Sequence, residues 1–107
     1  MEERESGGSP LRSVRLLEVR GPTSRFVDAE VREDGSLVVC GQDVGDLPRR
    51  MFDDGDYEFW VTVPARAKDD LLLALIESRW AGRDRAVDEF RDFCRERGVE
   101  SEFGTWS

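Results

Sequence analysis

The chain has 107 residues, a formal net charge of −8 and no histidine. A chain of this length forms one domain around a single core. The negative charge argues against nucleic acid and anionic membranes as partners, because both attract basic surfaces. The absence of histidine excludes catalytic triads, proton shuttles and metal sites that depend on that residue.

The sequence also predicts the cellular compartment. No apolar run approaches the ~20 residues that cross a bilayer, and the acidic, polar N-terminus lacks the apolar region of a secretory signal. We therefore expect a cytoplasmic protein. In a reducing compartment Cys40 and Cys94 are expected to be buried free thiols, not a disulfide.

Residues 1–10 (MEERESGGSP) are predicted to form a disordered tail, and residues 11–107 a single α+β domain. The first strand is expected over residues 11–20, with one face formed by Val14, Leu16 and Glu18 and the other by Arg15, Leu17 and Val19. Residues 25–33 alternate cleanly, which predicts a strand with one wet face. The wet face of that strand would hold Phe26, Asp28, Glu30 and Arg32.

Asp34 and Gly35 predict a hairpin turn into a central strand over residues 36–41. An acidic connection follows, with a short helix expected over residues 47–52. The next strand, residues 56–63, ends at Pro64, which lacks a donor N–H. Its alternation places Glu58, Trp60 and Thr62 on the face opposite Tyr57, Phe59, Val61 and Val63. The Trp60 face is therefore either partly covered or a contact surface.

After Pro64 the apolar period changes to 3.6 residues, which predicts a core helix ending at Gly82, with Leu75 deep in its apolar face. A second helix is expected from Asp84 to Gly98, and the alternating segment Val99 to Trp106 is predicted to be a final strand. The predicted fold is α+β, a curved antiparallel sheet of about five strands with two helices packed on one face, in the order β-β-β-β-α-α-β.

Several segments give the chain a resemblance to a small, uncharacterised bacterial domain of the kind seen in actinobacteria. The segments are GQDVG, MFDDGDYEFWVTV, LLLALIESRW and GVESEFGTW, from Gly41 onward, and they cover about two thirds of the chain. The resemblance implies the fold and carries no catalytic residue. In composition the chain is also similar to immunity proteins of bacterial toxin systems, which are small, acidic α+β proteins.

The candidate functional residues come from one acidic region. Residues 26–60 include ten acidic and three basic residues, which gives this region a net charge of −7. Clustered acids beside aromatic side chains suit the recognition of a basic protein, because Trp anchors interfaces while charge steers association. The candidate partner-binding residues are Asp43, Asp46, Asp53, Asp54, Asp56, Glu58, Trp60 and Trp106.

The same acids are compatible with two other chemistries. Carboxylate oxygens bind Ca²⁺ or Mg²⁺, but DDGDYE does not have the ligand spacing of a calcium loop. Glu58 beside Trp60 would suit general acid or base catalysis if the indole desolvated it, although nothing in the sequence sets a second carboxylate at catalytic distance. We therefore expect no catalytic residue, no metal and no cofactor.

The sequence favours a non-enzymatic protein-binding module, immunity-like or regulatory, that recognises a basic protein surface and is a monomer or weak homodimer. The alternative is a carboxylate-dependent enzyme or a divalent-metal-binding domain that uses the acids between Asp43 and Glu58.

Overall fold

The computed structural model describes residues 9–45 and 56–106. They belong to two compact units, one up to Lys68 and one from Asp69 onward, and each is described by itself. The predicted tail lies outside the described residues except for its last two positions, and so do the predicted helix over residues 47–52 and most of the acidic connection.

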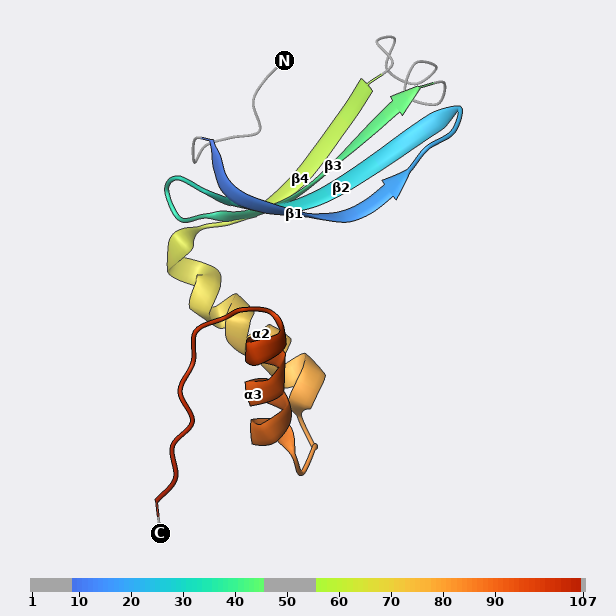
Figure 1. Ribbon diagram of the computed structural model, residues 1–107. Helices are drawn as coiled ribbons and strands as arrows, with labels where there is room; N and C mark the ends of the chain where they lie inside the picture. Colours follow the sequence, from blue (N-terminus) through green and yellow to red (C-terminus); the bar gives the residue numbers. More distant parts are fainter. Residues whose placement is uncertain (1–8, 46–55, 107) are drawn as a thin grey trace. The chain divides into compact units, whose positions relative to one another are not determined.

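The first unit is an antiparallel sheet of four strands in the order β1-β2-β3-β4, so each strand pairs with the next in sequence (Figure 1). The strands are β1 (Pro10–Val19), β2 (Thr23–Arg32), β3 (Leu37–Gly45) and β4 (Asp56–Val63). The sheet is visibly curved in Figure 1. Pro10, which the sequence assigned to the tail, already pairs with Arg32.

The predicted hairpin between β2 and β3 is confirmed. Gly35 has a φ of +86°, a conformation that side chains with a Cβ rarely adopt. The Asp34 carboxylate accepts a 2.9 Å hydrogen bond from the Ser36 N–H. Hydrogen bonding from Ser36 lowers the pKa of Asp34 below its ordinary value.

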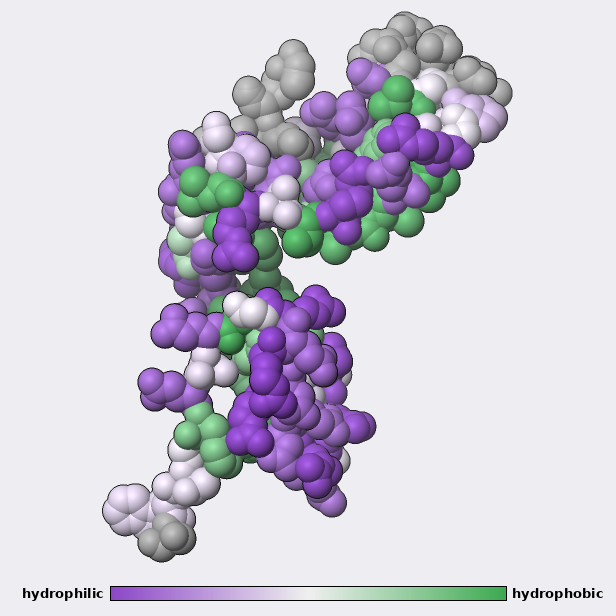
Figure 2. Space-filling model, viewed as in Figure 1, coloured by the Kyte–Doolittle hydropathy of each residue, from purple (hydrophilic) through white to green (hydrophobic). Residues whose placement is uncertain are grey.

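The register between neighbouring strands defines two faces. Figure 2 shows apolar residues gathered along one side of the sheet. We call this the apolar face, and it includes Val14, Leu17, Val19, Val27, Val31, Val39, Phe59, Val61 and Val63. The polar face includes Arg15, Glu18, Phe26, Asp28, Glu30, Val38, Cys40, Gln42, Glu58, Trp60 and Thr62.

The first strand departs from the predicted alternation at Leu16. Arg15 pairs with Asp28 and Leu17 pairs with Val27, so Leu16 is an extra residue without a partner in β2. This β-bulge reverses the alternation beyond it. Leu17 therefore joins Val14 on the apolar face, whereas a regular strand would have placed the two on opposite faces.

The second unit contains α2 (Lys68–Trp80) and α3 (Ala86–Glu96), which confirms the two predicted helices. A 3₁₀ turn, η1 (Ala65–Ala67), precedes α2. Trp80 is buried and packs edge-on against Phe90 and Phe93, with ring centroids 5.3 and 5.7 Å away. This aromatic cluster joins the two helices. Leu75, predicted to lie in the core, is 55% exposed.

The predicted fifth strand is wrong, because residues 99–106 belong to no strand or helix. The segment instead makes local contacts with α3. The Val99 N–H donates to the Cys94 carbonyl at 2.8 Å, and the Arg91 guanidinium lies 4.2 Å from the Phe103 ring centroid. Alternating residues alone did not reveal these contacts, which compete with strand pairing. The packing of the helices on the sheet stays a prediction.

Among the described residues, no helix has the length and apolar character needed to span a membrane.

Candidate functional site

Asp43 lies on β3 and is nearly buried, with 5% of its surface exposed. Its carboxylate accepts two hydrogen bonds from the Arg25 guanidinium, at 2.6 and 2.7 Å. This paired geometry lowers the pKa of Asp43 and raises that of Arg25. The charge of Asp43 is thus neutralised by Arg25 and is not available to a partner.

The Arg25–Asp43 pair lies on the apolar face together with two aromatic rings of β4. The Arg25 guanidinium is 5.5 Å from the Phe59 centroid, and Phe59 stacks on Tyr57 at 5.3 Å. Gly41 makes room for this arrangement, because a Cβ there would stand 2.4 Å from the Phe59 ring. Asp43 is therefore on the face opposite Glu58 and Trp60.

The structure brings together three other candidate residues on β4. Asp56, Glu58 and Trp60 alternate along the strand and share the polar face. Trp60 is 45% exposed. Neither Glu58 nor Trp60 has a hydrogen bond, ion pair or ring contact with any part of the chain that the structure describes. Both side chains are thus available to a partner.

The remaining candidates lie outside the described residues or in the second unit. Asp46, Asp53 and Asp54 lie outside the described residues. Trp106 belongs to the second unit, where it lies in the segment of residues 99–106 that follows α3, and it is 97% exposed.

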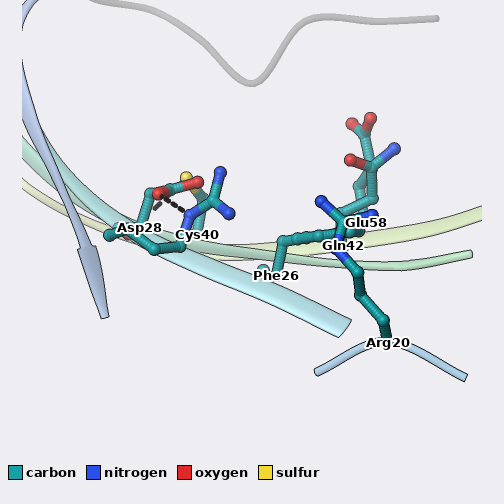
Figure 3. Close-up of a pocket in the computed structure, with 8 residues that line it drawn as sticks. Arg20, Phe26, Asp28, Cys40, Gln42 and Glu58 are labelled. Carbon is teal, nitrogen blue, oxygen red and sulfur yellow. Dashed lines mark hydrogen bonds and ion pairs between the residues drawn. The ribbon is translucent and has the colours of Figure 1, made fainter. Parts of the chain in front are cut away.

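A pocket of about 280 Å³ opens on the polar face beside Glu58. Figure 3 shows Phe26 between the Asp28–Cys40 end of the pocket and the end that holds Gln42 and Glu58. Its lining residues are Arg15, Arg20, Phe26, Asp28, Cys40, Gly41, Gln42 and Glu58.

The cations of this pocket are already paired. Arg15 contacts Asp28 and Glu18 at 2.7 Å, and Arg20 contacts the other oxygen of Glu18 at the same distance. Both guanidinium groups also lie near the Phe26 ring, at 5.2 and 5.1 Å. Glu58 is consequently the one lining charge without an ion pair in the described part of the chain.

Deeper on the same face, the structure buries a polar cluster that the sequence did not reveal. Glu30 and Arg32 are 7% and 6% exposed and form an ion pair at 2.8 Å. The Cys40 thiol lies 3.7 Å from Glu30 Oε2. The expectation of a wet face on β2 is therefore wrong at these positions. The sequence feature that comes closest to indicating this burial is the apolar pair Val38 and Cys40, which lies opposite Glu30 and Asp28.

The described residues contain no group of three or more acidic or cysteine side chains placed to hold a metal ion. No protein-family model, curated protein or solved structure matches this chain. The geometry of the polar face is thus the basis on which a function is proposed.

Proposed function

We propose that this protein is a non-enzymatic protein-binding module that recognises a basic partner through the polar face of β4. The observation that carries the proposal is that a carboxylate without an ion pair in the described part of the chain and an exposed indole share one face of β4. Glu58 and Trp60 lie two residues apart on one face, and neither has a partner among the described residues.

The chemistry of the two side chains is complementary in recognition. The indole of Trp60, 45% exposed, offers a large apolar surface and an N–H donor, the combination that makes Trp common in interface hot spots. Glu58 supplies a charge that would pair with Lys or Arg of the partner. Gln42, directly opposite Glu58 on β3, adds an amide donor and acceptor.

Long-range charge supports the same choice of partner. The net charge of −7 between Phe26 and Trp60 includes Asp46, Asp53 and Asp54, which lie outside the described residues. A concentrated negative field speeds the association of a basic partner and is screened by salt. Since Asp28, Glu30 and Asp43 are ion-paired with arginines, the steering charge would come from the remaining acids of this region.

The proposal is tested by capture from a lysate of the source organism with matched variants of the immobilised protein. One variant is the double substitution Glu58→Gln with Trp60→Ala. The control is Glu100→Gln, which removes an exposed acid from the second unit. A partner of the polar face binds the wild type and the control but not the double variant. If every captured protein binds the double variant equally, the proposal is wrong.

Two further measurements extend the test. Trp106→Ala, assayed in the same way, decides whether this exposed indole contacts the same partner. Association rates measured above about 0.15 M salt, where the screening length is about 8 Å, should fall while dissociation changes little.

A further inference from the structure

Among the described residues, the order β1-β2-β3-β4 leaves two strands at the edges of the sheet. An edge strand presents a row of unpaired backbone N–H and C=O groups, which can pair with a strand from another molecule. Proteins prevent this with prolines, bulges and charged side chains, especially lysine. The two edges of this sheet differ in these protections.

The β1 edge is protected. It begins at Pro10, and its pairing with β2 is interrupted twice, between Pro10 and Arg12 and between Arg15 and Leu17. Such irregularities twist an edge away from a regular ladder. The strand also carries the ion-paired side chains Arg15 and Glu18.

The β4 edge has fewer of these protections. Eight residues, Asp56–Val63, pair with β3 in one unbroken register. The strand contains no proline and no basic residue, and its only charges are Asp56 and Glu58. Strand addition at this edge would therefore meet no steric obstacle from the described strand itself, and the Glu58 carboxylate favours a basic strand.

Side chains on both faces of β4 could also contact an added strand. On the polar face Glu58 and Trp60 have no partner among the described residues. On the apolar face Val61 is 67% exposed. Directly opposite side chains of paired strands come within about 5 Å of each other and contribute to pairing. An added strand would thus place basic groups near Glu58 and β-branched residues near Val61.

We propose that the partner binds by adding an extended segment to the outer edge of β4, with basic residues on the polar face and β-branched residues on the apolar face. This inference rests on the proposed function and specifies its partner. Backbone hydrogen bonds along the edge would supply affinity, and the side chains beside Glu58, Trp60 and Val61 would supply specificity.

The test uses the full chain and a synthetic peptide of about eight residues, a typical strand length, that alternates valine with lysine, arginine or threonine. In ¹⁵N NMR with hydrogen exchange, the peptide should slow exchange at alternate amides of β4, because every second N–H points to the free edge. A peptide with glutamate in place of its basic residues should bind at least about tenfold more weakly, the loss expected for an opposed charge.

Two N-methylated versions of the peptide test backbone pairing directly. Methylation of every second amide removes donors from one edge of the peptide only. One version should therefore lose at least about tenfold in affinity while the other binds like the unmodified peptide. Equal binding of both versions, or no saturation up to about 1 mM peptide, overturns strand addition.

These outcomes separate the inference from the function on which it rests. If a captured partner requires Glu58 and Trp60 but no alternating peptide protects β4 amides, the module binds proteins without strand addition. If the peptide protects β4 while the captured proteins ignore both side chains, the edge is competent and the proposed surface is wrong.

Discussion

At some positions the two faces of the sheet depart from the usual relation between polarity and burial. On the polar face Glu30 and Arg32 are 7% and 6% exposed, whereas on the apolar face Val14 and Val61 are 60% and 67% exposed. Alternation along a strand determines which side chains share a face. The alternation does not determine which face of the sheet other parts of the protein cover. Whether an ion pair is buried therefore depends on the residues around it.

The strongest test of this contrast is Glu30→Ala. It removes the Glu30 carboxylate from the buried Arg32 guanidinium, and removal of one partner from a buried ion pair costs about 3–5 kcal/mol. Urea unfolding followed by circular dichroism measures the loss. Glu33→Ala removes an exposed acid nearby and should stay within about 0.5 kcal/mol of the wild type. Equal losses of unfolding free energy in the two variants would show that Glu30 and Arg32 are not buried in solution.

On the apolar face, Gly41→Ala tests the packing of Phe59. The new Cβ would stand 2.4 Å from the ring, and overpacking of this kind costs about 1–3 kcal/mol in unfolding free energy. Gly21→Ala is the control, since the nearest atom to its Cβ is 3.9 Å away. In a Phe59→Ala background the cost of Gly41→Ala should largely disappear, and its persistence would contradict the proposed cause.

Asp43→Asn sharpens the contrast through pH. The pKa of Asp43 is lowered in the folded protein, so its ion pair stabilises the fold above the ordinary carboxyl pKa near 3.9, and this stabilisation is lost as the pH falls through the lower folded value. The advantage of wild type over variant should shrink between neutral pH and about pH 3.

Urea midpoints measured across this pH range provide the readout for Asp43→Asn. Arg25→Met removes the same ion pair from the other side and should flatten the profile in the same way. Profiles of wild type and both variants that run parallel would show that the pair adds no stability.

The smallest effect is expected for Val61→Ala. Because Val61 is 67% exposed, its truncation should change the unfolding free energy by less than about 0.5 kcal/mol. Val38, 2% exposed on the polar face, is the matched comparison, and Val38→Ala should cost at least about 1 kcal/mol. Equal losses would show that the apolar face is covered in solution.

Features set by local sequence were predictable. The Asp34–Gly35 turn depends on two adjacent residues, and the alternation of β4 placed Glu58 with Trp60 as expected. Both helices were also found: the apolar residues of α3 recur at helical spacing along the helix, and those of α2 form a continuous apolar run. These parts of the fold need no information about distant contacts.

Features set by pairing between segments were not predictable. The face on which Asp43 lies relative to Glu58 depends on the β3–β4 register, which no residue in either strand specifies by itself. The partner of Asp43 is Arg25, eighteen positions earlier. The coil over residues 99–106 likewise reflects contacts with α3 that compete with the strand pattern.

The bulge at Leu16 makes β1 unusual in its response to changes in length. Deletion of one residue from a regular strand turns every later side chain to the other face. Here Leu16 is the extra residue and Leu17 is identical to it, so the loss of either codon gives the same protein, with Arg15 and the remaining leucine opposite the adjacent residues Asp28 and Val27. A deletion at this position should therefore survive selection more readily than one in a regular stretch of the strand, and the bulge gives the gene a site where a frame-preserving deletion is tolerated.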